Sequence, residues 1–133
     1  MESERKVAIN SERDIVVARQ KGRAMATELG FSLGNATLIA TAISELARNI
    51  ISYAGKGEIF MSVVYHSERT GIIIVASDNG PGIPDVPLAL RDGFSTSGSL
   101  GIGLPGTRRL MDEFAIVSEP GHGTIVTVTK WKS

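Results

Sequence analysis

The chain has 133 residues and a mass of 14.1 kDa, enough for one core, and we predict a single domain that spans residues 1–133. Its 14 Lys and Arg residues equal its 14 Asp and Glu residues, so charge gives no reason to expect binding to nucleic acid or to an anionic membrane. The absence of cysteine excludes disulfides and thiolate chemistry, and no stretch reads as a signal core or a membrane span, so we expect a cytoplasmic protein.

The first half of the chain predicts one strand and two helices. Residues 6–10 form a short candidate strand, and a Ser followed three residues later by an acid, at 11–14, is a helix-start signal. Apolar residues at three- and four-residue steps then predict a helix over residues 14–29, and Gly30 stops it. A wider apolar face predicts a second helix over residues 35–54, which also ends before a glycine.

The second half predicts four strands and one further helix. Residues 58–67 and 71–77 read as a hairpin whose second strand is buried, because it carries a run of β-branched side chains. A proline in the first turn favours a helix over residues 104–111. Residues 115–119 read as a strand, and residues 124–131 read as a half-buried strand because apolar and polar side chains alternate.

Glycine is concentrated in residues 78–106, which hold seven of the 15 glycines. Because glycine has no Cβ, its backbone can approach a ligand closely, so this stretch predicts two backbone surfaces around an anionic or planar ligand. Residues 92–100 are small and polar, and we interpret them as a mobile cover of that site. Residues 101–106 match the dinucleotide pattern GxGxxG, but they lack the preceding strand which that pattern requires.

Four short motifs follow one another along the chain: ELARN at 45–49, DNGPG at 78–82, GIG at 101–103 and GHGT at 121–124. In this order they resemble the N box, G1, G2 and terminal Gly-Thr elements of the GHKL superfamily. Its members include gyrase, Hsp90, MutL, histidine kinases and the bacterial anti-sigma-factor serine kinases. The resemblance implies the α/β fold of that superfamily, the Bergerat fold. That fold is an α+β two-layer sandwich in which helices cover one face of a mixed, largely antiparallel sheet.

The resemblance also implies that the cofactors are ATP and Mg²⁺. Asp78, at the end of a buried strand, then accepts a hydrogen bond from the exocyclic amine of adenine. Guanine has a carbonyl in that place and is rejected, because an unpaired buried polar group costs about 1–3 kcal/mol. Gly82 lets the backbone lie against the base edge, Gly80 belongs to the same binding motif, and Thr124 supports Asp78 directly or through a water.

The remaining site residues are expected around the phosphates. Asn49 supplies an amide oxygen, a hard ligand, to Mg²⁺ that the phosphates hold jointly. Gly101, Gly103 and the N-terminus of the helix that follows donate N–H groups to phosphate oxygens. Glu45 is placed one helical turn before Asn49 to take the proton of the attacking hydroxyl. On spacing alone, Glu45 and Asn49 read as a solvated polar pair, and the resemblance gives them these roles.

A lone domain of this length is most similar to the small anti-sigma-factor serine kinases and, within them, to the switch kinases of the bacterial stressosome. The similarity implies a protein serine/threonine kinase that phosphorylates a STAS-domain scaffold protein and, once released, activates a PP2C-type phosphatase. Two alternatives stay open: an anti-sigma factor kinase that binds a sigma subunit directly, and a nucleotide-gated binding module without catalysis. Neither nucleic acid nor a membrane is an expected partner.

One departure from the family pattern concerns positive charge near the phosphates. Residues 92–107 contain no Lys or Arg, and Arg108 and Arg109 are the nearest candidates by sequence. We therefore expect slow turnover or a catalytic contribution from a partner. Arg48 is expected to point away from Glu45, into a salt bridge or a partner contact.

Overall fold

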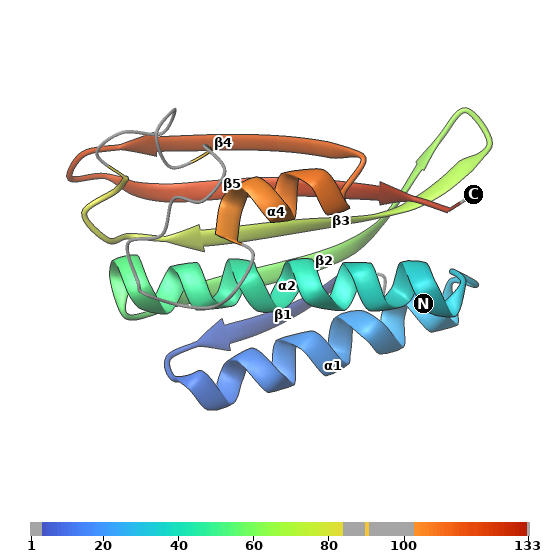
Figure 1. The fold of residues 1–133 in the computed structure, drawn as a ribbon, viewed down its shortest axis with the longest axis horizontal. Coiled ribbons are helices and arrows are strands. Elements are labelled where there is room, and N and C mark those ends of the chain that lie inside the picture. The colour runs from blue at the N-terminus through green and yellow to red at the C-terminus, as the bar shows by residue number, and fades with distance from the viewer. Residues whose placement is uncertain (1–3, 84–89, 91–102, 133) are drawn as a thin grey trace.

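The computed structural model describes residues 4–83, 90 and 103–132 of the chain (Figure 1). This part of the chain contains three helices and five strands. In chain order the elements are β1 (Glu4–Ile9), α1 (Glu12–Glu28), α2 (Leu33–Ala54), β2 (Gly57–His66), β3 (Arg69–Asp78), α4 (Gly103–Leu110), β4 (Glu113–Glu119) and β5 (Gly123–Trp131).

The five strands form one sheet in the order β1-β2-β3-β5-β4. Neighbouring strands are antiparallel in all four described pairings, so the mixed component that we expected is absent from this part of the chain. β3 occupies the centre of the sheet, which explains why its sequence is so rich in β-branched apolar residues. The predicted α/β class with a largely antiparallel sheet is confirmed.

All three helices lie on one face of the sheet, and α2 runs between α1 and α4 (Figure 1). The apolar stripes predicted from the sequence face the sheet, because burial of these side chains is the main favourable contribution to folding. No helix in the described residues is long and apolar enough to cross a bilayer. The largest fully buried apolar side chains, which form the centre of the core, are Ile9, Ile39, Ile43, Leu46, Ile59, Met61, Ile72, Ile74 and Val128.

The helix ends follow start and stop signals in the sequence. α1 begins two residues earlier than predicted, and the Asp14 carboxylate in its first turn accepts the Asn10 N–H at 2.8 Å. α2 also begins two residues earlier, because the Ser32 hydroxyl caps it by accepting the Asn35 N–H at 3.1 Å. α2 ends at Ala54, and the Gly55 that follows has a φ of 81°, the left-handed backbone typical of a helix stop.

The β2–β3 hairpin turns more tightly than the sequence predicted. Its turn consists of Ser67 and Glu68, which both have positive φ, 48° and 68°. A two-residue turn of this kind matches the right-handed twist of the flanking strands. The two strands therefore stay paired as far as His66 and Arg69, whereas we had predicted that the second strand begins at residue 71.

Strand register and helix packing bring the predicted site residues to one end of the sheet. Asp78, the last residue of β3, is the cross-strand partner of Thr124 near the start of β5. The C-terminal half of α2, which carries Glu45 and Asn49, packs over this end. α4 begins at Gly103, in contact with α2.

Candidate active site

A cleft opens between α2, the adjoining ends of β3 and β5, and the start of α4. Its enclosed part is narrow, with a cavity volume of about 20 Å³. Its lining combines apolar side chains with a few polar ones: Leu46, Asn49, Ile50, Tyr53, Ala76, Asp78, Ile83, Leu104, Thr124 and Val126. An apolar cleft with a small number of convergent polar groups is the usual form of a small-molecule site.

Asp78 is a buried carboxyl group in this cleft, with only 9% of the residue exposed. Its Oδ1 accepts the Gly80 N–H at 2.9 Å. Burial raises the pKa of Asp78 above its ordinary value of 3.8, and backbone hydrogen bonds from Gly80 and Thr124 act in the opposite direction. A buried acceptor fixed by backbone donors is suited to recognise one N–H donor of a ligand in a defined direction.

The loop after Asp78 requires glycine at two positions, because the backbone passes close to other parts of the protein. A Cβ on Gly80 would lie 2.5 Å from the Cβ of Ala54 at the end of α2. Gly82 has a φ of 82°, and a Cβ there would lie 2.4 Å from the Glu119 carbonyl oxygen. We predicted a close approach of Gly82 to the edge of a base; the close neighbour in the protein itself is the Glu119 backbone.

Ser118 connects this loop to the strand that carries Thr124. Its Oγ accepts the Ile83 N–H at 2.7 Å and lies 2.8 Å from the Thr124 hydroxyl oxygen. The Thr124 side chain is therefore directed to Ser118, and the support that Thr124 gives to Asp78 comes from its backbone N–H. The sequence analysis missed Ser118. Half-buried and exposed positions alternate along β4, and a serine at one of the half-buried positions was the signal that could have indicated it.

Asn49 lines the same cleft as Asp78, and its side-chain amide lacks a partner. Its Nδ2 is buried without a hydrogen bond in the described part of the chain. An unpaired buried polar group costs about 1–3 kcal/mol, and in native proteins such a group often marks a place for a ligand, an ion or a water. The unpaired Nδ2 of Asn49 can therefore donate a hydrogen bond to an acceptor that reaches it.

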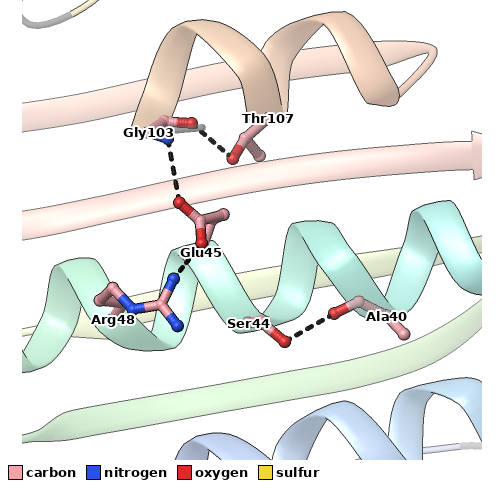
Figure 2. Close-up of polar contacts among 6 residues, drawn as sticks. All are labelled: Ala40, Ser44, Glu45, Arg48, Gly103 and Thr107. Atoms are coloured by element: carbon pink, nitrogen blue, oxygen red, sulfur yellow. Dashed lines mark hydrogen bonds and ion pairs between the residues drawn. The ribbon is translucent and has the colours of Figure 1, made fainter. Parts of the chain in front are cut away.

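Glu45 lies beside the cleft on α2, one turn before Asn49, and only 6% of the residue is exposed. Figure 2 shows that both of its carboxylate oxygens are engaged. Oε1 accepts the Gly103 N–H at 2.9 Å, and Oε2 is paired with the Arg48 guanidinium. A carboxylate at the first turn of a helix is stabilised by the free N–H groups and the helix dipole. The Gly103 N–H that we assigned to a phosphate is therefore donated to Glu45 in this structure.

Arg48 forms a salt bridge, as we expected, but its partner is Glu45, which corrects our expectation that it points away from that residue. The two residues are three apart on α2, so their side chains project from the same side of one helical turn. Arg108 and Arg109, which sequence position favoured as phosphate contacts, occupy the last turn of α4, away from Gly103 at its start.

Two parts of the predicted site lie outside the described residues: Gly101, assigned to phosphate binding, and residues 92–100, interpreted as a cover. The other predicted site residues all gather at this end of the sheet. They are Glu45, Asn49, Asp78, Gly80, Gly82, Gly103 and Thr124.

Comparison with protein families assigns the class of protein. The family of histidine kinase-, DNA gyrase B- and HSP90-like ATPases matches residues 34–133. Because this match covers most of the chain, the protein belongs to that family. The resemblance drawn from the four motifs is confirmed.

Two relatives show to which members of the family the chain is similar. The chain is 55% identical over 125 residues to the serine/threonine-protein kinase RsbT of Bacillus subtilis (strain 168), covering 94% of each chain. It is 32% identical over 118 residues to an anti-sigma F factor of Caldanaerobacter subterraneus subsp. tengcongensis, covering 86% of this chain and 82% of the relative.

Solved structures give the same fold at low sequence identity. The mycobacterial sensor histidine kinase MprB matches with a TM-score of 0.57 and 16% identity over 97% of each chain. The catalytic domain of the histidine kinase ThkA matches with a TM-score of 0.54 and 15% identity over 96% of each chain. At these identities the likeness establishes the fold alone.

Proposed function

We propose that this chain is an ATP-dependent protein serine/threonine kinase. The observation that carries the proposal is the buried carboxylate of Glu45 beside a cleft that also contains Asp78 and Asn49. A site that only binds a nucleotide has no need of a base, whereas phosphoryl transfer to a hydroxyl group does. The family assignment and the 55% identity to a relative named as a serine/threonine kinase support the same conclusion.

Adenine is recognised by Asp78 in this proposal. The buried carboxyl accepts the exocyclic amine, and the apolar lining of the cleft packs against the faces of the base. Guanine would place a carbonyl oxygen against the carboxylate, leave both acceptors unpaired and lose about 1–3 kcal/mol. The Gly80 and Thr124 N–H groups keep the carboxyl in the direction that this discrimination needs.

Mg²⁺ fits the polar residues of the cleft only as an ion shared with phosphates. Among the described residues no three or more His, Asp or Glu side chains gather into a metal site, so the protein offers no complete cage. The side-chain oxygen of Asn49, which lines the cleft, is an appropriate single ligand, because Mg²⁺ in such sites is held by one or two protein oxygens together with phosphates and waters. When bound, the ion neutralises phosphate charge. Asn49 then provides its amide oxygen, so the amide must be oriented with this oxygen toward the cleft.

The start of α4 is the proposed contact for phosphate oxygens. The first N–H groups of a helix have no partner within it and carry partial positive charge. Gly103 donates its N–H to Glu45 in the free protein, so a phosphate that uses this donor displaces the carboxylate from it. Binding of the nucleotide then releases one oxygen of Glu45 for chemistry.

Glu45 is the proposed general base. It takes the proton of the acceptor hydroxyl while the hydroxyl oxygen bonds to the γ-phosphorus and the bond between that phosphorus and the leaving ADP breaks. Its low exposure limits competing hydrogen bonds from water. The products are a phosphorylated Ser or Thr, ADP and a proton held at Glu45 until solvent removes it.

The proposed substrate is a STAS-domain scaffold protein in a bacterial stress-signalling switch, and the proposed later partner is a PP2C-type phosphatase that the released kinase activates. The motif resemblance and the identity to RsbT support this choice. The proposed location is the cytoplasm. The anti-sigma F factors among the relatives favour one second candidate, an anti-sigma factor kinase that binds a sigma subunit directly.

The test is transfer of labelled phosphate from ATP, with Mg²⁺, to purified STAS-domain proteins from the same cell. A parallel pull-down compares a STAS protein with sigma subunits. Phosphorylation of a STAS protein at Ser or Thr supports the proposal, whereas capture of a sigma subunit alone supports the second candidate. Tight ATP binding without transfer to any protein would leave only a nucleotide-gated binding module.

A further inference from the structure

Arg48 is the cation that contacts the proposed base. Its guanidinium is paired with Glu45 Oε2, while the Gly103 N–H occupies Oε1 at 2.9 Å (Figure 2). The exposure of the two side chains differs strongly, 8% for Glu45 and 40% for Arg48. The buried carboxylate is thus held from one side by the start of α4 and from the solvent side by Arg48.

We propose that Arg48 is a positioning residue which orients the Glu45 carboxylate for proton transfer, an inference that rests on the proposed function. A Glu side chain has three rotatable bonds, and a base must lie within hydrogen-bond reach of the hydroxyl that it deprotonates. When a phosphate takes the Gly103 N–H, the carboxylate loses one of the two restraints that the described residues give it. Of these two, the Arg48 pair is then the one that remains.

A guanidinium suits this task because it is planar, permanently charged and able to donate two parallel hydrogen bonds. Because the Glu45 side chain is only 8% exposed, removing Arg48 leaves a buried carboxylate without its cation and lowers stability as well. The effect that matters for catalysis is on the geometry of this carboxylate. We therefore expect Arg48 to affect the rate of phosphate transfer and not the affinity for ATP.

Three variants test this role in the full chain with ATP, Mg²⁺ and a STAS substrate. Arg48→Ala removes the restraint, and Arg48→Lys keeps the charge without the planar fork. Arg19→Ala on the exposed side of α1 is the matched control. We expect Arg48→Ala to lower kcat about 10- to 100-fold with little change in KM for ATP, because misplacing a catalytic group has effects of that size. Arg48→Lys should restore part of the rate, and Arg19→Ala should match the wild type.

The Glu45→Gln background separates positioning from other roles. If Arg48 acts through the carboxylate, adding Arg48→Ala to Glu45→Gln causes no further loss of the residual rate. An equal loss in both backgrounds, or a change in KM for ATP without a change in kcat, overturns the inference and leaves the kinase proposal intact.

Thermal unfolding keeps the inference testable if the wild type transfers no phosphate. That result would contradict the kinase proposal itself, and the pairing is then judged from the melting temperatures of Glu45→Gln, Arg48→Ala and the double variant. Non-additive shifts support the Glu45–Arg48 contact in solution, whereas additive shifts overturn it. The same measurement shows whether any variant fails to fold.

Discussion

Replacing Asp78 by asparagine removes one buried charge from the cleft and leaves the shape of the side chain almost unchanged. Asp78 is 9% exposed, and its Oδ1 accepts the Gly80 N–H at 2.9 Å, a bond that the asparagine oxygen can also accept. In the proposed complex the carboxylate also accepts the amino group of adenine. A hydrogen bond to a charged group contributes about 1.5–3 kcal/mol. We expect ATP binding to weaken by roughly 10- to 150-fold, since 1.4 kcal/mol corresponds to a factor of ten.

The assay is calorimetric titration of ATP with Mg²⁺ into wild type and Asp78→Asn. A carboxylate-to-amide change at Asp112, whose Oδ2 accepts the Trp131 N–H at the opposite end of β5, is the control. Thermal unfolding of each sample excludes loss of the fold as the cause of weaker binding. Unchanged ATP affinity in a folded Asp78→Asn protein would refute the assignment of Asp78 as the adenine acceptor.

Three further predictions follow from burial, backbone geometry and the unpaired amide. Burial raises the pKa of Asp78 above 3.8, so wild type loses stability relative to Asp78→Asn as the pH rises from 3.8 through the raised pKa. In urea unfolding, the difference in unfolding free energy between the two proteins should be smallest below pH 3.8 and should grow above it. Gly82→Ala should lower the free energy of unfolding by about 2–5 kcal/mol, of which roughly 1–2 kcal/mol comes from the positive φ and about 1–3 kcal/mol from the contact with Glu119. Gly121→Ala, with a φ of 83° and no neighbour within 4 Å, should lose only the first part in the same unfolding experiment. Asn49→Ala should keep or slightly raise the melting temperature, because it removes an unpaired buried group, while Mg²⁺-dependent ATP affinity falls about tenfold or more.

The helices and strands could be predicted because they depend on patterns local in sequence. The three-to-four-residue spacing of apolar side chains in α2 and the alternation in β5 each indicate one element and the face that it buries. The helix starts differed by two residues because a cap depends on one side chain, such as Ser32, and several nearby residues could have served.

The contacts within the site could be predicted only in part. The motifs indicated that Asp78, Asn49 and Glu45 act together, and the structure brings them to one end of the sheet. The partners of these residues come from distant parts of the chain, as when the Gly103 N–H reaches Glu45 across 58 positions. Spacing along the sequence contains no information about such a pair, and the same reason hid the link between Ser118 and the loop after β3.

The assignment of Glu45 as the base, with Asp78 and Asn49 holding the nucleotide, is tested most directly by Glu45→Gln. One preparation supplies both the single-turnover rate of phosphate transfer to a STAS protein and the dissociation constant for ATP. We expect the rate to fall by about 100-fold or more, the usual contribution of a general base, while ATP affinity stays the same or increases. Affinity does not fall because the variant removes a negative charge beside the Gly103 N–H. A transfer rate equal to that of the wild type would contradict the assignment.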